Sequence, residues 1–259
     1  MNKIFRNIFL SFILSAVLAC FSACKPYAHI NKVETNIISI DTISLIQEDS
    51  GFISFIKPYK EKMDSQMNDV LVYSEQAMMK GLPEGLLNNF VSDLVLLKSN
   101  EYYTPADGQK IDFCLLNNGG LRAALPKGAI TRKNVFELLP FENKIVVMTL
   151  TAEKIKQMFI YIAKSGGMPI SGFSMGIKDT IPVNISIKGK ALDTTRKYKV
   201  VTSDYLAAGG DKMRFFSNPV NKEELSIKMR DAIITYMTEE HKKGNKLKVT
   251  LDNRIYYDK

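Results

Sequence analysis

The chain has few of the side chains on which nucleophilic and acid-base catalysis depends. Its 259 residues contain two histidines, three cysteines and no tryptophan. A serine or cysteine nucleophile needs a neighbouring base, most often a histidine. His29 lies near the start of the chain and His241 lies in the charged run 239–243, so neither is a promising general base. A self-sufficient hydrolase of either type is therefore disfavoured.

The scarcity of cysteine also excludes a disulfide-stapled fold. Cys20 and Cys24 lie near the N-terminus, and Cys114 lies between apolar neighbours in the run 111–116. If Cys24 is acylated, Cys114 is the thiol left within the fold, and its neighbours predict an inert buried thiol rather than a nucleophile. One internal cysteine forms no intramolecular disulfide, so stability must come from packing.

The N-terminus has the pattern of a bacterial lipoprotein signal. Two basic residues precede an apolar stretch, residues 8–18, that is too short and one-sided to be a convincing membrane span. Small residues then precede a cysteine. Cys24 ends where polarity begins at Lys25, whereas Cys20 has the better aliphatic residue three places upstream. We favour Cys24 as the lipidation site, and Cys20 remains the alternative.

These features predict a signal peptide over residues 1–23, a tether over residues 24–35 and one folded domain over residues 36–259. The composition, 46% hydrophobic and 24% charged, falls in the ordinary globular range. The expected location is the bacterial cell envelope, where a lipid anchor holds the domain on the periplasm-facing side of a membrane. Which membrane and leaflet carry the anchor stays open.

The net charge is mild for this length. Residues 1–23 hold two of the 35 Lys and Arg and none of the 27 Asp and Glu, so loss of the signal changes the formal charge from +8 to +6. The densest basic cluster, residues 242–248, lacks interleaved aromatics, and nucleic-acid binding is disfavoured. A basic surface instead favours anionic substrates or an acidic partner by long-range attraction, which salt weakens.

Apolar periodicity predicts a mixed α and β pattern. Helices are expected over residues 56–67 and 86–97. A third helix is expected after a cap at Thr151, and its apolar face contains Ile155, Met158, Phe159 and Ile162. The last long helix is expected to have an apolar face formed by Leu225, Met229, Ala232, Ile233 and Tyr236. Strands are expected over residues 37–46, 70–73, 111–116, 145–148, 171–177, 181–187, 198–202 and 253–257. This is an α+β pattern with mixed sheets.

Three segments combine a strand, a special turn and ligand-type side chains. The first, residues 116–122, ends an apolar run with Asn-Asn-Gly-Gly and presents backbone donors beside Arg122. The second is Leu-Pro-Phe-Glu-Asn at 139–143, and the third is residues 204–211, which follow another expected strand. A glycine turn alone is more often a plain tight turn that needs positive φ. The joint occurrence of the three segments carries more weight.

In this order and spacing, with Gly-Ala-Ile-Thr at 128–131 between the first two, the segments resemble the C-terminal domain of the 5'-nucleotidases. These are periplasmic and cell-surface enzymes that remove phosphate from nucleotides. The likeness runs from about residue 72 to residue 257. It implies an α+β fold, with mixed β-sheets flanked by helices, and a site for a nucleoside or nucleotide.

The resemblance implies a role for each matching residue. Phe141 and Tyr205 match an aromatic pair that clamps the nucleobase, and because stacking tolerates any base, base preference stays open. Asn117 matches an amide that helps to hold the nucleoside. Arg122 matches a guanidinium directed at ribose and phosphate oxygens, and Asp211 matches a carboxylate that accepts from ribose hydroxyls.

Asn143 lies at a motif position too, and the other residues also have plainer interpretations. Phe141 could be a core anchor at a strand start, and Tyr205 could be a half-buried aromatic with its hydroxyl in water. Arg122 and Asp211 could pair with one another or be solvated surface charges, which would add little stability. These alternatives stay open at the level of sequence.

The chain departs from the family in two ways. The catalytic half of a 5'-nucleotidase is a separate N-terminal metallophosphoesterase domain, whose Asp, Asn and His residues hold two metal ions. Two histidines cannot provide that set, so we expect no metal or other cofactor in this chain. Family members also often carry an arginine just before the residue that matches Glu84, and here Gly81 takes its place beside Lys80. Lys80 is a less directional substitute, which leaves phosphate affinity open.

Three functions remain for this chain. The first is the nucleoside-recognition half of a 5'-nucleotidase for nucleotide catabolism, inactive until a separate metallophosphoesterase polypeptide supplies the metals. The second is a lipid-anchored protein that captures nucleosides or nucleotides without hydrolysis. The third is a structural lipoprotein that keeps the fold without the ligand. We favour the first, because the aromatic pair, Arg122 and Asp211 are all present. Whether a catalytic partner exists, and the oligomeric state, stay open.

Overall fold

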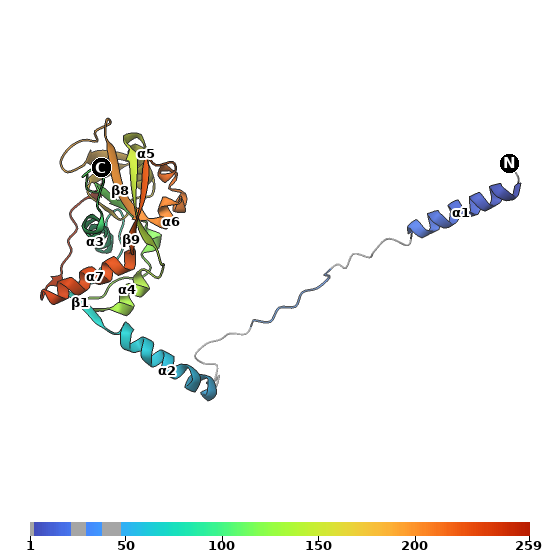
Figure 1. The fold of residues 1–259 in the computed structure, drawn as a ribbon, viewed down its shortest axis with the longest axis horizontal. Coiled ribbons are helices and arrows are strands. Elements are labelled where there is room, and N and C mark those ends of the chain that lie inside the picture. Colours follow the sequence, from blue (N-terminus) through green and yellow to red (C-terminus); the bar gives the residue numbers. More distant parts are fainter. Residues whose placement is uncertain (1–2, 22–29, 38–47) are drawn as a thin grey trace. The chain divides into compact units, whose positions relative to one another are not determined.

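The computed structural model describes residues 3–21, 30–37 and 48–259 of the chain (Figure 1). By their contacts the residues separate into two units, 1–50 and 51–259. The first unit holds helix α1 (Lys3–Phe21). Among the described residues, no helix is both long and apolar enough to cross a membrane. Cys24 and most of the strand expected over 37–46 lie outside the described residues.

A five-stranded mixed sheet forms the centre of the second unit. Strand β8 pairs in parallel with β2 on one side and antiparallel with β4 on the other, and β5 and β9 form the two edges. In spatial order the strands are β5 (Ile170–Ser171), β2 (Phe113–Leu115), β8 (Lys197–Ser203), β4 (Lys144–Thr151) and β9 (Asn221–Lys228).

Side chains of the central strands alternate between two hydrophobic cores, because successive residues of a strand point to opposite faces. On β4, Ile145 and Val147 belong to one core, whereas Val146 and Met148 belong to the other. On β2, Cys114 belongs to the first core and its two strand neighbours belong to the second. The sheet is buried on both faces, which explains the continuous apolar runs of these strands in the sequence.

One face of the central sheet is covered by three helices and a three-stranded sheet, and the other face is covered by helix α5 (Ala152–Lys164) and a second three-stranded sheet. The first layer contains α3 (Leu86–Tyr102), α4 (Arg132–Leu138), α7 (Met229–Lys242) and, in spatial order, β10 (Lys246–Leu247), β1 (Val70–Ser74) and β3 (Gly128–Thr131). The second layer contains α5 and, in spatial order, β11 (Ile255–Tyr257), β6 (Ser174–Lys178) and β7 (Ile181–Ser186). Helix α2 (Ser50–Met67) buries none of its residues, and the short helix α6 (Asp204–Ala207) follows β8.

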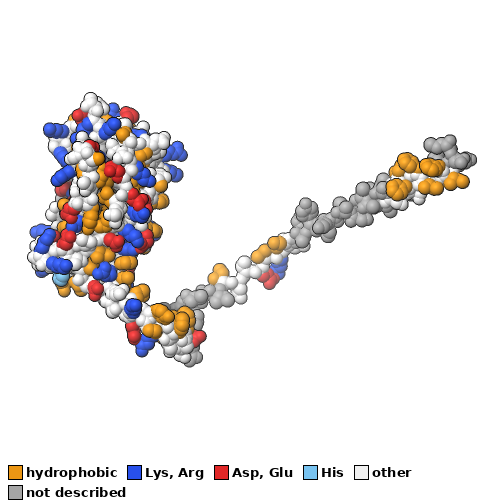
Figure 2. Space-filling model, in the orientation of Figure 1, with side chains coloured by type: hydrophobic (Ala, Val, Ile, Leu, Met, Phe, Trp, Pro, Cys, Tyr) orange, Lys and Arg blue, Asp and Glu red, His pale blue; other side chains and the backbone are white. Residues whose placement is uncertain are grey.

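Basic and acidic side chains mix on the surface of the second unit. On the face that Figure 2 shows, Lys and Arg side chains are interspersed with Asp and Glu. A protein that tracks nucleic acid usually concentrates its positive charge in one stripe or patch. The visible face has no such stripe.

The expected α+β class with mixed sheets is confirmed. The apolar face predicted for α5 is fully buried, as its helical spacing indicates. This helix begins directly after Thr151, but the Thr151 side chain accepts no capping hydrogen bond, so that part of the expectation was wrong. A reciprocal capping box forms instead at α4, where Thr131 is the N-cap residue.

Two other expectations were wrong. Leu225 lies on the edge strand β9, and the last helix begins at Met229. The strand expected over residues 171–177 is divided, because β5 pairs in the central sheet and β6 pairs with β7 in another sheet. Gly172 lies at the break with φ +97°, and an added Cβ there would lie 2.2 Å from the Asp112 carbonyl oxygen. The passage of the chain from β5 to β6 therefore requires glycine at position 172.

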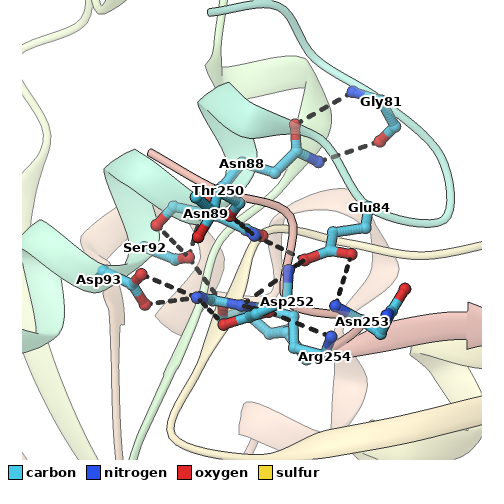
Figure 3. Close-up of polar contacts among 11 residues, drawn as sticks. Gly81, Glu84, Asn88, Asn89, Ser92, Asp93, Thr250, Asp252, Asn253 and Arg254 are labelled. Carbon is cyan, nitrogen blue, oxygen red and sulfur yellow. Dashed lines mark hydrogen bonds and ion pairs between the residues drawn. The ribbon is translucent and has the colours of Figure 1, made fainter. Parts of the chain in front are cut away.

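A polar cluster fixes the C-terminal segment to α3 and the loop before it (Figure 3). The Glu84 carboxylate accepts from the backbone N–H groups of Asp252 and Asn253 at 3.0 and 3.1 Å. The Arg254 guanidinium donates two bonds to the Asp93 carboxylate at 2.5 and 2.8 Å and further bonds to Asp252. The hydrogen bonds from Arg254 lower the pKa of the Asp252 carboxyl. Bidentate pairs of this kind are strong and fix geometry.

We expect Arg254→Met to lower the free energy of unfolding by about 2 kcal/mol, because the segment loses a forked, charge-assisted contact while both carboxylates rehydrate. Chemical denaturation at neutral pH measures this loss. Lys133→Met is the control, since the Lys133 side chain is 62% exposed and its pair with Glu137 is long, at 3.9 Å. An exposed pair contributes less than about 1 kcal/mol. Equal effects of the two variants would contradict this account.

Candidate functional site

Three strand ends meet at one edge of the central sheet. Because β2 and β8 are parallel, their carboxyl ends lie at the same edge, and β4, which is antiparallel to β8, begins there. The register pairs Ile145 near the start of β4 with Ser203 at the end of β8. The segments 116–122, 139–143 and 204–211 follow or precede these strand ends. Strand pairing therefore brings together segments that are far apart in the sequence.

These segments enclose a pocket of about 400 Å³. Its lining includes Gly119 and Gly120 of the first turn and every residue that the sequence predicted to bind ligand. Those residues are Asn117, Arg122, Phe141, Asn143, Tyr205 and Asp211. The structure thus brings the whole predicted set to one place, while the binding role of each residue stays a prediction.

Two half-exposed aromatic rings line the pocket. Phe141 is 49% exposed and Tyr205 is 50% exposed. A core anchor would be buried, so that interpretation of Phe141 was wrong. Tyr205 lies on α6, where the side chain of Ser203 caps the helix by accepting from the Leu206 N–H. Both rings therefore offer apolar surface to a ligand.

Asp211 is held in place as an acceptor. One carboxylate oxygen accepts from Asn117 Nδ2 at 2.6 Å, and the other accepts from the Tyr205 hydroxyl at 2.9 Å. Its backbone carbonyl accepts from the hydroxyl of Tyr161 on α5 at 2.8 Å. Asp211 has a φ of 52°, a left-handed conformation that non-glycine residues adopt rarely. The three hydrogen bonds hold the residue in this conformation.

Arg122 and Asp211 are not partners of one another. Arg122 Nη1 donates to the Gly119 carbonyl at 3.2 Å, and within the described part of the chain its guanidinium joins no ion pair. Its backbone N–H donates to the carbonyl of Leu138 at 2.8 Å, which ties the turn to the end of α4. Most of the five guanidinium donors are therefore free to bind an anion.

Buried amides of α3 support the turn that carries Asn117. Asn88 is 1% exposed, and its Nδ2 donates to Asn118 Oδ1 at 2.9 Å and to the Gly81 carbonyl at 3.2 Å. Lys80 Nζ donates to the Asn118 carbonyl at 3.2 Å. The sequence reasoning missed Asn88 as a support. Its signal is a polar residue within the apolar run of a buried helix, which indicates a hydrogen-bonding partner.

The backbone at Gly81 leaves no space for a side chain. An added Cβ would lie 2.2 Å from the carbonyl oxygen of Glu84. The Gly81 N–H also donates to Asn88 Oδ1 at 3.3 Å. An arginine at this position would therefore require a different loop, and Lys80 is not among the residues that line the pocket.

No group of three or more His, Cys, Asp or Glu side chains is placed to hold a metal ion in the described ranges. His241 is exposed, with its ring centroid 6.0 Å from that of Tyr73, and His29 lies outside those ranges. The side chains that line the pocket include two aromatic rings and several groups that donate or accept hydrogen bonds.

An open pocket lined by aromatic, amide, guanidinium and carboxylate groups thus lies at one edge of a mixed sheet in an α+β fold. The chain belongs to the family described as "5'-nucleotidase, C-terminal domain", whose profile matches residues 70–218. The resemblance inferred from the three segments is thereby confirmed.

Curated relatives and solved structures agree with this assignment. The chain is 29% identical over 173 residues to a 5'-nucleotidase of Vibrio vulnificus. The aligned residues cover 65% of this chain and 30% of the relative. It is 28% identical over 223 residues to a trifunctional nucleotide phosphoesterase of Bacillus subtilis, covering 76% of this chain and 14% of that protein. The structure of a 5'-nucleotidase precursor from Thermus thermophilus has a TM-score of 0.66 at 22% identity, covering 81% of this chain and 43% of that one. The structural likeness shows the fold, and the chain spans less than a third of the length of these curated relatives.

The buried thiol of β2 gives a test of the interpretation that Cys114 is inert. Cys114 is completely buried, and this burial raises the pKa of its thiol. In a Cys20→Ala, Cys24→Ala variant, where Cys114 is the single thiol, we expect no reaction with an aromatic disulfide reagent at pH 8 until denaturant is added. Absorbance of the released thiolate measures the reaction. Stoichiometric labelling of the native protein within seconds would contradict the inert interpretation.

Proposed function

We propose that this chain is the nucleoside or nucleotide recognition domain of a 5'-nucleotidase-type phosphohydrolase in nucleotide catabolism. A metallophosphoesterase on a separate polypeptide supplies the metal ions and the attacking water. The observation that carries the proposal is the pocket lining, in which two half-exposed rings, a fixed carboxylate and a guanidinium with free donors lie together. The relatives named as 5'-nucleotidases support the reaction class.

In this proposal the nucleobase lies between Phe141 and Tyr205. Stacking on an aromatic ring contributes on the order of 1–3 kcal/mol per base and tolerates every base, because each base has a π face. The rings come from separate segments, one before β4 and one after β8. The domain therefore accepts nucleosides with different bases.

Asp211 and Asn117 hold the sugar. The two ribose hydroxyls are donors that converge on the two oxygens of a carboxylate. Each Asp211 oxygen already accepts one hydrogen bond, from Asn117 or from Tyr205, and keeps a second lone pair. The ribose therefore adds to the existing network instead of replacing it, and Asn143 offers a further amide on the pocket wall.

Arg122 faces the anionic side of a nucleotide. Its planar fork can donate two bonds at once to phosphate or ribose oxygens. Lys80 donates to the Asn118 carbonyl in the same turn but does not line the pocket, and it adds only a point charge. Metal ions of the catalytic partner would supply the main contacts to the phosphate, and this domain holds the nucleoside.

The location belongs to the same proposal. A signal over residues 1–23 directs export, and an acyl group on Cys24 anchors the protein in the bacterial cell envelope with the domain facing the periplasm. The support is the order of basic, apolar and small residues before that cysteine. Residues 24–35 then form a tether to the folded domain.

Calorimetric titration with adenosine and AMP tests nucleoside recognition. We expect the double variant Phe141→Ala, Tyr205→Ala to bind adenosine at least about 10-fold more weakly than the wild type, because each lost stacking face contributes about 1–3 kcal/mol. Tyr59→Ala is the control, since Tyr59 is an exposed aromatic on α2 that does not line the pocket. Unchanged affinity in the double variant would contradict the stacking site. A wild type without affinity would favour the structural lipoprotein.

The purified chain alone should release no phosphate from AMP with Mg²⁺, Mn²⁺, Co²⁺ or Zn²⁺. The physical reason is that the described residues hold no cluster that could bind two metal ions. A colorimetric assay of inorganic phosphate measures the activity, with addition of a metallophosphoesterase as the positive arm. Metal-dependent release by the chain alone, sensitive to Arg122→Ala, would overturn the two-polypeptide proposal.

A further inference from the structure

Phe141 lies in an irregular segment, and a stacking ring needs a fixed backbone. The segment 139–143 connects α4 to β4 without regular secondary structure, and half of the Phe141 side chain is exposed. The ring itself therefore does little to hold the segment in place. A mobile ring would lose conformational freedom on stacking against a base, and this loss would weaken binding.

Arg230, in the first turn of α7, contacts this segment on both sides of the ring. Its Nη1 donates to the carbonyls of Leu139 at 3.2 Å and Pro140 at 3.4 Å. Its Nη2 forms an ion pair with the Glu142 carboxylate. The residues directly before and after Phe141 are thus bound to one guanidinium.

The environment of Arg230 is unusual for a charged side chain. Arg230 is 6% exposed, and its Nε is buried without a hydrogen-bond partner among the described residues. The guanidinium carbon lies 4.0 Å from the ring centroid of Phe136 on α4, which fixes the plane of the fork. Burial of a charge is unfavourable by itself and often contributes little net stability. The contact set therefore favours a role in geometry over a role in stability.

The junction of β9 and α7 makes two further contacts with the same segment. The Met229 N–H donates to the Asn143 carbonyl at 2.9 Å, and Lys228 pairs with the Glu142 carboxylate. The hydrogen bonds from Lys228 and Arg230 lower the pKa of Glu142, so this carboxylate stays ionised at neutral pH. Four of the five residues of the Phe141 segment are therefore bound to the start of α7, and Arg230 makes the contacts to three of them.

We propose that Arg230 is a positioning residue that holds Phe141 in the orientation for base stacking. The guanidinium acts through the backbone carbonyls of Leu139 and Pro140 and through Glu142, and it does not itself touch the ligand. The effect of Arg230 on ligand binding rests on the proposed function. The effect of Arg230 on the orientation of Phe141 does not, because it concerns the motion of the ring in the free protein.

The absence of tryptophan from the chain gives a direct probe of that motion. In the full chain, Phe141→Trp places a single indole at the position of the ring. Its fluorescence anisotropy reports local motion without any ligand. We expect Arg230→Met and Arg230→Lys, each made in this background, to lower the anisotropy clearly, because neither side chain can bond both carbonyls and the carboxylate as a planar fork does.

Lys98→Met is the matched control for the loss of a buried cation. Lys98 is 3% exposed and pairs with Glu239 near the other end of α7. Its replacement should change stability without changing the anisotropy of the indole. If Arg230→Met does not fold, Glu142→Gln tests the positioning role instead. Glu142 is half-exposed, and its replacement leaves the contacts of Arg230 with the two carbonyls in place. This variant should lower the anisotropy less than Arg230→Lys does.

A double-mutant cycle, measured by adenosine titration, tests the effect of Arg230 on ligand binding. We expect Arg230→Met alone to weaken binding by about 10-fold, within the range that loss of one stacking contact allows. Added to Phe141→Ala, the same change should weaken binding less than about 2-fold further, since the ring through which it acts is gone.

Unchanged anisotropy of the indole in the folded Arg230 variants would overturn the positioning inference whether or not the protein binds nucleosides. Additive losses in the cycle would also contradict it, because they would show that Arg230 acts independently of Phe141. If the wild type binds no adenosine but the Arg230 variants lower the anisotropy, the positioning of Phe141 stands and the proposed function fails.

Discussion

The site depends on the pairing of β8 between a parallel neighbour and an antiparallel neighbour. Parallel pairing with β2 brings the carboxyl ends of two strands to one edge of the sheet, and antiparallel pairing with β4 brings the start of the third strand there. Arg122, Phe141 and Tyr205 are widely separated in the sequence, yet they line one pocket because they follow or precede these strand ends. The pairing of the strands thus determines which residues line the pocket.

Polar groups outside the pocket hold in place the three segments that follow or precede these strand ends. Asn88 supports the first turn through Asn118, and Tyr161 holds the third segment by donating to the Asp211 carbonyl. Arg230 binds the second segment on both sides of its ring. These supports come from three helices, α3, α5 and α7, that pack on the two faces of the central sheet. A site held in this way is preorganised, which reduces the entropy that a ligand must overcome on binding.

Apolar periodicity predicted most regular elements, and the resemblance of three segments to the 5'-nucleotidase C-terminal domain supplied the residues that line the pocket. The central strands have continuous apolar runs, and the site segments have turn residues beside ligand-type side chains. Leu225 was misassigned because β9 is an edge strand in which only that residue is buried, so its pattern has no clear period of two. Arg230 was missed because its partners lie 88 to 91 residues earlier in the chain, and no local pattern shows such a contact. The sequence indicated that a glycine replaces the family arginine at position 81, and the structure adds that the backbone there leaves no space for a side chain.

The central claim is that the pocket binds a nucleoside between two rings and leaves catalysis to a metallophosphoesterase on a separate polypeptide. A crystal structure of the chain with bound adenosine tests the binding half most directly. The account predicts the base between Phe141 and Tyr205, the ribose hydroxyls within hydrogen-bonding distance of the Asp211 carboxylate, and an unchanged path of residues 139–143. Adenosine bound at another place, or bound in the pocket with its base away from both rings, would contradict it.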